Sequence, residues 1–261
     1  MSTKTDQRAK TILQHLLHHG NTSVDELAAE LDASPASVRR DLARLEERGL
    51  VHRTHGGAKL RGPAYYEPFR FDSSFQEREG RFIEEKRRIG VAAAELIREH
   101  ETVCISAGTT TSQIALSLRH RSGLRVVTNA LNIGMEFNPV SNIEVTLSGG
   151  NMRWAGSFSL TGPAALDTLG NLFCDRAFLG ACGVDPVRGA TTIEQDEASV
   201  FRIMARNAKE VIVVADSSKI GMVSPALICP ASDIDILITD TGISSEAMAG
   251  FQASGVRVLA V

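Results

Sequence analysis

The sequence predicts two domains of different fold in succession, a winged helix-turn-helix followed by a mostly parallel, Rossmann-like α/β domain. The N-terminal quarter contains three short helical patterns and then a Gly-Gly pair of the kind found in hairpin turns. From about residue 100 onward, short runs rich in Val and Ile alternate with helical segments. Such alternation is typical of a parallel sheet that is covered by helices.

The composition is that of an ordinary globular protein, with 43% hydrophobic residues, 23% charged residues and a net charge of −3. The sequence has no apolar run of the length that crosses a bilayer, about 18 residues. Four scattered cysteines without a CxxC pair favour a reducing compartment. We therefore expect a cytoplasmic protein with no membrane partner and no cofactor.

Three helices are expected in the first domain. The first runs from Lys4 to Gly20, and three of its histidines share one helical face without a carboxylate or cysteine beside them, so we expect no metal there. The second helix begins after Ser23, where Glu26 stands at the capping-box position. Ser34 is the expected N-cap of the third helix, and Pro35 suits its first position.

The third helix has the surface expected of a helix that reads DNA. Val38, Leu42 and Leu45 fall on one arc and face the supporting helices, which leaves small residues and arginines outward. Small residues permit close approach to the major groove, and arginine can donate two hydrogen bonds to guanine. The candidate DNA-contacting residues, including two in the wing, are Ser34, Ala36, Ser37, Arg39, Arg40, Arg44, Arg53 and His55. The alternative is that these arginines only solvate an amphipathic helix.

The domain boundaries follow from a stretch without periodicity that contains two prolines and both tyrosines. We place the DNA-binding domain at residues 1–61, a linker at 62–76 and the α/β domain at 77–261. One charged helix is expected to open the last of these at Glu77. The seven expected strands are TVCIS, RVVT, IEVTLS, RAFLGA, VIVVA, DILIT and VRVLAV.

Glycine and hydroxyl-bearing residues follow five of these strands directly. Because the carboxyl ends of parallel strands line the ligand crevice of an open sheet, these loops predict a binding site. The segment from Gly108 to Thr111 precedes a helix, so its free amides and hydroxyls can cradle an anion, with Lys219 as the cation. Asn129 suits sugar hydroxyls. The alternative for the Gly-Thr segment alone is a capped strand-to-helix turn.

The order of motifs resembles one known family. The run SPASVRRDLARLEERGLVHRTHGGA closely resembles the helix-turn-helix signature of the DeoR family. Further matches follow as EREGRFIEEKRRIG, SAGTTT, VTNA, LSGG, FLGACGVD, ADSSK and LITD, so the resemblance covers nearly the whole chain. It implies a sensor domain similar to ribose-5-phosphate isomerase, and usually a repressor of carbohydrate genes that a phosphorylated sugar releases from operator DNA.

The resemblance also places three acidic residues near the pocket, and each of them can instead be a cap or a surface charge. The full set of candidate ligand-binding residues is Gly108, Thr109, Thr110, Thr111, Asn129, Gly149, Gly150, Gly183, Asp185, Glu197, Asp216 and Lys219. Cys182 departs from the family pattern, because relatives usually carry a polar residue such as Asp or Ser at this position.

The expected function is ligand-controlled DNA binding by a homo-oligomer, a dimer or a tetramer. One short recognition helix reads few bases, and symmetric operators need symmetric readers. The rival is a sugar-phosphate isomerase with a DNA-binding appendage, because acid–base residues are available. No cluster in the sequence has an obvious base for a carbon acid, and a shared fold is not an activity. An activator of the same family is a third possibility.

Overall fold

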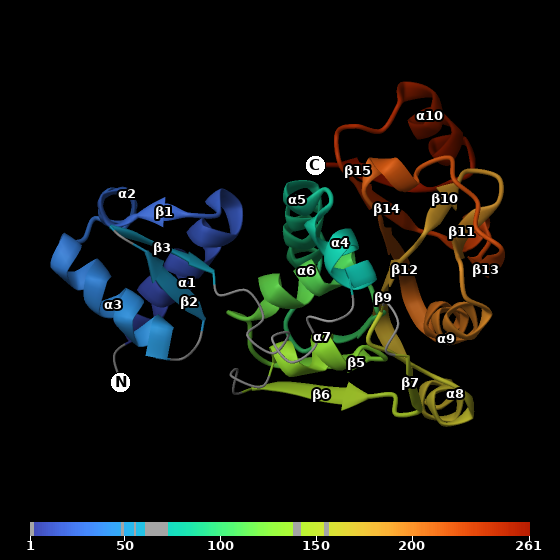
Figure 1. The fold of residues 1–261 in the computed structure, drawn as a ribbon, viewed down its shortest axis with the longest axis horizontal. Coiled ribbons are helices and arrows are strands. Elements are labelled where there is room, and N and C mark those ends of the chain that lie inside the picture. Colours follow the sequence, from blue (N-terminus) through green and yellow to red (C-terminus); the bar gives the residue numbers. More distant parts are fainter. Residues whose placement is uncertain (1–2, 48–49, 55, 61–72, 138–141, 154–156) are drawn as a thin grey trace. The chain divides into compact units, whose positions relative to one another are not determined.

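The computed structural model describes residues 3–47, 50–54, 56–60, 73–137, 142–153 and 157–261 (Figure 1). The chain divides into two compact units, Met1–Glu67 and Pro68–Val261. In the described ranges, no helix has the length and apolar character needed to span a bilayer.

The first unit consists of three helices and a small antiparallel sheet. Its elements are α1 (Thr3–His19), β1 (Thr22–Ser23), α2 (Val24–Glu30), α3 (Pro35–Glu47), β2 (Val51–Thr54) and β3 (Gly57–Leu60). The apolar faces of the three helices meet in one core that includes Leu16, Leu27 and Leu42. The three predicted helices and the wing hairpin are therefore present.

The turns of the first unit have the chemistry that the sequence predicts. The Ser23 hydroxyl accepts the Glu26 amide, and the Glu26 carboxylate accepts the Ser23 amide at 2.8 Å, which completes the capping box. In the wing, a Cβ atom at Gly57 would lie 2.2 Å from the carbonyl oxygen of Thr22. This close approach lets β1 pair with β3, a third strand that the sequence did not indicate.

The second unit is built on a seven-stranded parallel sheet with the order β15-β14-β12-β9-β4-β5-β6. These strands correspond to the seven predicted runs. Their bounds are β4 (Thr102–Ile105), β5 (Leu124–Thr128), β6 (Ile143–Leu147), β9 (Cys174–Gly180), β12 (Ala208–Val214), β14 (Ile236–Thr239) and β15 (Arg257–Ala260).

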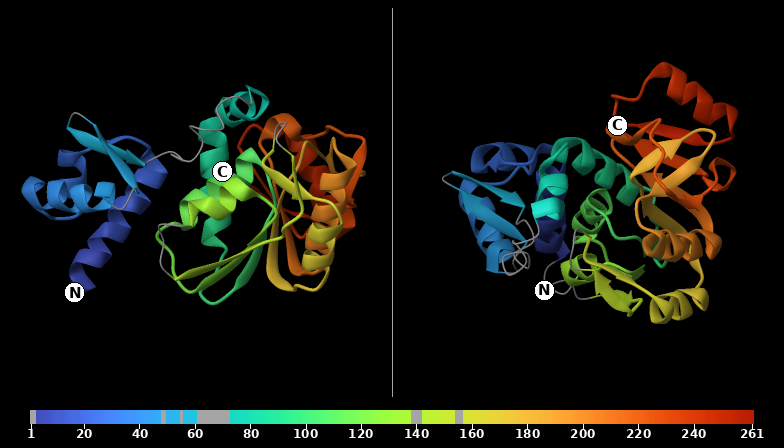
Figure 2. Two further views of the ribbon diagram at one scale, coloured as in Figure 1. Left: turned by 60° about the horizontal axis from the view of Figure 1, so that its bottom comes forward. Right: turned by 45° about the vertical axis from the view of Figure 1, so that its right-hand side comes forward.

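Helices cover both faces of this sheet (Figure 2). The helices are α4 (Ser73–Gly80), α5 (Ile83–Glu95), α6 (Thr109–Leu118), α7 (Leu131–Glu136), α8 (Pro163–Gly170), α9 (Gln195–Arg206) and α10 (Ser245–Ala253). The chain starts in the middle of the sheet at β4, winds outward through β5 and β6, and then returns to β9 on the other side of β4. The strand order therefore reverses between β4 and β9, which is where doubly wound sheets bind ligands.

The structure departs from the sequence-based prediction in two respects. The single charged helix expected from Glu77 is two helices, because Phe82 adopts a left-handed conformation (φ 56°) between α4 and α5. Smaller strands that the sequence did not indicate form an antiparallel sheet and a hairpin beside the main sheet. They are β10 (Gly183–Asp185), β11 (Gly189–Thr192) and β13 (Ala226–Cys229) in the sheet, and β7 (Asn151–Arg153) with β8 (Ser159–Thr161) in the hairpin.

Candidate functional site

The outer face of α3 is the candidate DNA-reading surface. Ser34 caps the helix, because its hydroxyl accepts the Ser37 amide at 3.2 Å. Ala36, Arg39, Arg40 and Arg44 are exposed, and Ser37 is half-buried at the N-terminal end of this face. The one acidic residue within the arginine run, Asp41, points inward and is ion-paired with Arg8 of α1 at 2.8 Å. The arginines of α3 therefore do not depend on Asp41 for charge compensation.

The wing differs from α3 in its charge environment. The amide of Arg53 donates to the Glu46 carboxylate at 3.0 Å, and the Arg53 guanidinium lies 3.8 Å from the same carboxylate. Glu46 thus ties the first strand of the wing to the end of α3. His55, the other predicted wing contact, lies outside the described residues.

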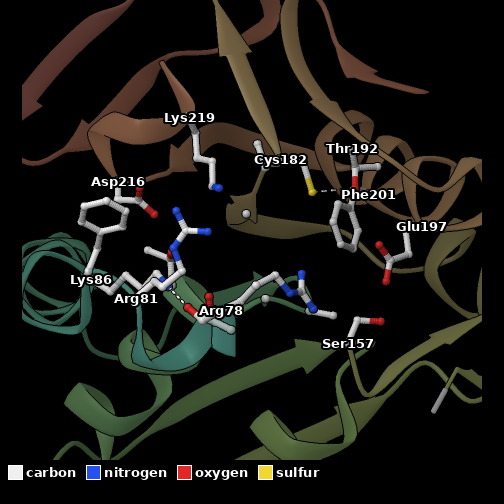
Figure 3. A pocket seen from close by; sticks show the side chains of 17 residues that line it. Arg78, Arg81, Lys86, Ser157, Cys182, Thr192, Glu197, Phe201, Asp216 and Lys219 are labelled. Carbon is white, nitrogen blue, oxygen red and sulfur yellow. Dashed lines mark hydrogen bonds between the residues drawn. The ribbon is translucent and has the colours of Figure 1, made fainter. Parts of the chain in front are cut away.

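In the second unit a cleft lies at the point where the strand order reverses (Figure 3). Its empty volume is about 770 Å³, a figure that includes open solvent at its mouth. Its floor comes from the loops that follow the two central strands, Ala107–Thr110 after β4 and Gly180–Cys182 after β9. Lys219, after β12, and Glu197, on α9, lie along its sides.

The N-terminus of α6 faces this cleft, and side-chain hydrogen bonds fix its backbone. The hydroxyls of Thr111 and Ser112 donate to the Gly108 carbonyl at 2.9 and 2.8 Å. The first amides of the helix have no carbonyl partner within it, because no helical turn precedes them. The side chain of Asn129 accepts the Ala107 amide at 2.9 Å and so fixes the start of the loop. Amides at a helix N-terminus favour an anion.

Among the described residues, four cationic side chains line the cleft: Arg78, Arg81, Lys86 and Lys219. In Figure 3 the side chain of Arg81 extends toward Lys219, and that of Arg78 extends toward Ser157 and Glu197. The cations come from three separate segments, namely α4 with the turn that follows it, α5, and the 3₁₀ turn after β12. They surround the same opening that the α6 N-terminus faces.

Lys86 reaches the cleft because α5 lies unusually close to α6. A Cβ atom at Gly90, one turn after Lys86, would lie 2.6 Å from the Cβ of Gln113 and 2.7 Å from its backbone carbon. Gly90 therefore permits the close packing of the two helices. Lys86, on the same side of α5, is only 4% exposed and donates through Nζ to the Arg78 carbonyl.

The environment of Lys86 opposes its charge. The pKa of Lys86 is lowered to about 8, chiefly by burial and also by the neighbouring cations Lys219 and Arg78, whereas Asp216 and Glu79 act in the opposite direction. Burial likewise raises the pKa of Glu79, although the charge of Lys86 partly counteracts that rise. The cleft thus holds more positive charge than its own carboxylates compensate, which is the electrostatic condition for binding an anion.

Two carboxylates line the same cleft. Asp216 is 2% exposed and accepts the Ser218 amide at 3.2 Å, together with the Ser218 hydroxyl, so it also caps the turn that presents Lys219. Glu197 lies in the first turn of α9, opposite the lysines. Carboxylates can accept hydrogen bonds from the hydroxyls of a polyol.

The structure gathers six of the predicted ligand-binding residues in the cleft: Gly108, Thr109, Thr110, Glu197, Asp216 and Lys219. Cys182 is also there, with its sulfur 3.5 Å from the Thr192 hydroxyl.

The other six predicted residues do not line the cleft: Thr111, Asn129, Gly149, Gly150, Gly183 and Asp185. The Asn129 amide is fully buried, and its Nδ2 donates to the Ser159 hydroxyl and the Leu160 carbonyl. Asp185 accepts the amides of Val187 and Arg188 in a tight turn. Gly150 and Gly183 lie so close to a neighbouring carbonyl that a Cβ atom would come within 2.3 and 2.4 Å of it.

Both parts of the chain match models of one family. Residues 8–63 match the DeoR-like helix-turn-helix domain, and residues 81–241 match the DeoR C terminal sensor domain. The chain belongs to the DeoR family. The HTH-type transcriptional regulator GolR of Listeria innocua is 34% identical, over 94% of both chains. The glycerol-3-phosphate regulon repressor of Escherichia coli K12 is 31% identical, over 91% of both.

A solved structure of ribose 5-phosphate isomerase A from Methanocaldococcus jannaschii is similar over 53% of this chain and 55% of its own, with 17% identity and a TM-score of 0.38. A likeness this distant says nothing about activity. The two relatives named above, in contrast, are transcriptional regulators, and the match to this chain extends over nearly their whole length.

Sequence reasoning missed the cations that α4 and α5 bring to this DeoR sensor pocket. Arg78, Arg81 and Lys86 all lie in the motif EREGRFIEEKRRIG, which predicts a charged helix and resembles the DeoR family, and none of the three is among the predicted site residues. The signal that could have found Lys86 is its place one turn before a glycine in an otherwise good helix-forming segment. Such a glycine often marks a close helix contact.

Proposed function

We propose that this DeoR-family protein is a sequence-specific DNA-binding repressor of carbohydrate genes, and that a phosphorylated sugar binding in the cleft releases it from its operator. The observation that carries the proposal is the cleft at the strand-order reversal. There, a helix N-terminus and several cations face one opening, with carboxylates on its sides. A phosphate needs the amides and cations, and a polyol needs hydrogen-bond acceptors for its hydroxyls.

On the DNA side, we assign the reading of bases to Arg40 and the contacts to phosphate to Arg39, Arg44 and the wing. All three arginines of α3 are exposed. Arg40 lies on the face opposite the buried Val38 and Leu42, and Arg39 and Arg44 flank that face. Phosphate contacts orient a protein on DNA, whereas contacts to base edges determine which sequence is bound. We further propose that the operator-bound form is a cytoplasmic dimer or tetramer.

The rival function is catalysis of sugar-phosphate isomerisation. Lys86, with its lowered pKa, and Asp216 are chemically capable of proton transfer. Against this, the named relatives are regulators, and Asp216 already accepts two hydrogen bonds from Ser218. We therefore propose binding without turnover. Incubation of the purified protein with aldose and ketose phosphates should give no interconversion, and turnover lost in Lys86→Met would reverse the ranking.

The experiment that tests the proposal is an electrophoretic mobility titration with operator DNA and a panel of sugar phosphates. Lys219→Ala and Thr110→Leu should bind the operator like the wild type when no sugar phosphate is present. Both should fail to release it at the concentration that releases the wild type, because the defect lies in sensing. Lys209→Ala, at an exposed lysine outside the cleft, is the matched control. Release of DNA by both cleft variants at the wild-type concentration would contradict the proposed binding site.

A further inference from the structure

Helix α4 occupies a special place in the sequence. It is the first described helix after the DNA-binding unit, which ends at Glu67. At its other end, Arg81 and the left-handed Phe82 connect it to α5. Arg78, Arg81 and Phe82, from α4 and this turn, all line the anion cleft. The segment of the sensor unit that comes first after the DNA-binding unit in the sequence therefore also lines the cleft.

The stability of α4 depends on what it packs against. It has only eight residues, and isolated helices shorter than about 12 residues are marginal in water. Its main apolar anchor is Phe75, which is buried and packs edge-to-face on Phe158 with ring centroids 5.0 Å apart. At the other end, the Arg78 carbonyl accepts Lys86 Nζ. The order of α4 thus depends on its contacts with the rest of the sensor unit, some of which are in the cleft.

An anion in the cleft would give α4 an additional attractive contact. Arg78 and Arg81, from α4 and the turn after it, line the same opening as Lys86 and Lys219. A phosphate dianion among these cations is attracted to each of them, so it links α4 to the lysines of the cleft.

We propose that the phosphate of the ligand fastens α4 to the sensor sheet through Arg78 and Arg81, so that α4 is the element that conveys occupancy of the cleft toward the DNA-binding unit. This inference rests on the proposed function, because it takes the cleft to bind an anion. It goes further in assigning the two arginines to the coupling of sites, whereas Lys219 and the α6 N-terminus hold the anion itself.

Hydrogen–deuterium exchange of the full-length protein with inorganic phosphate as the probe tests this directly. Sodium chloride of equal ionic strength serves as the reference. At a phosphate concentration ten times its dissociation constant, mass action slows exchange about tenfold in any segment that must open to release the anion. We expect this slowing in the peptide covering residues 73–82 and in the peptide covering 108–112, and none in α10.

The outcomes separate this inference from the proposed function. Protection of 108–112 without protection of 73–82 would overturn the fastening of α4 and leave the anion site in place. Protection of neither peptide would overturn the anion site, and the fastening of α4 with it. Protection of both supports the inference.

A pair of matched variants sharpens the test. Arg78→Gln, at saturating phosphate, should retain protection of 108–112 and lose most of the tenfold slowing in 73–82. Arg88→Gln removes the same charge from an exposed position on α5 and should behave like the wild type. If Arg78→Gln fails to fold, Arg81→Gln takes its place. Full protection of α4 in a folded variant would contradict the proposal.

Discussion

Replacing Lys86 by Met removes a buried cation but keeps an unbranched side chain of similar length. A fall in the pKa of a lysine from 10.5 to about 8 means that the protein opposes its charged form by on the order of 3 kcal/mol at neutral pH. The variant also loses the hydrogen bond to the Arg78 carbonyl, which offsets about 1–2 kcal/mol. We therefore expect Lys86→Met to be more stable than the wild type by about 1–2 kcal/mol at pH 7.

The pH dependence of the stability difference distinguishes removal of the buried charge from better packing alone. The native lysine loses its proton near pH 8, and the unfolded lysine keeps its proton until about pH 10.5. The wild type therefore carries the full penalty below pH 8 and regains stability as the pH rises between these two values. At pH 9.5 the advantage of the variant should be smaller by about 2 kcal/mol than at pH 7.

Urea unfolding followed by circular dichroism measures the stability difference between Lys86→Met and the wild type at pH 7 and at pH 9.5. The DNA-binding unit is identical in the two proteins, so the difference between the curves reports the sensor unit. Arg88→Met, on the exposed face of the same helix, should show no such pH-dependent difference. A Lys86→Met variant that is less stable than the wild type by the same amount at both pH values would refute the reasoning. The gain should accompany loss of phosphate-induced thermal stabilisation, as in other trade-offs between stability and function.

Three further predictions concern other parts of the molecule. Arg40→Ala should weaken operator binding by about 1–3 kcal/mol and relax preference at one base pair, measured by competition with operator variants; unchanged preference would contradict its role. Gly90→Ala should destabilise the sensor unit by about 1–3 kcal/mol in urea and weaken phosphate binding, because the new Cβ would lie 2.6 Å from the Cβ of Gln113 and force α5 away from α6. A fully stable variant would show that the helices separate at little cost. Analytical ultracentrifugation should find a dimer or tetramer on operator DNA, and a monomer that binds as tightly would disprove the expected symmetry.

The local structure and its order along the chain could be predicted from the residues alone. Val- and Ile-rich runs identified all seven strands of the parallel sheet, because a strand buried on both faces needs continuous apolar residues. Ser23 with Glu26, and Ser34 before Pro35, marked two helix starts through bonds that span only three residues. The residues that directly follow a strand, such as Gly108 and Lys219, could likewise be assigned to the sheet edge.

Which of these residues are neighbours in space could be seen only in the folded structure. Asn129 follows a strand as predicted, yet its side-chain amide is already hydrogen-bonded within the protein. It accepts the Ala107 amide and donates to the Ser159 hydroxyl, partners that are 22 and 30 residues away in the chain. Lys86 was not among the site residues predicted from the sequence. It reaches the cleft because Gly90 lets α5 approach Gln113, and because Phe82 bends the chain between α4 and α5. Local patterns reveal how a segment folds, but the neighbours of a side chain depend on contacts between segments far apart in the sequence, and periodicity carries no record of those contacts.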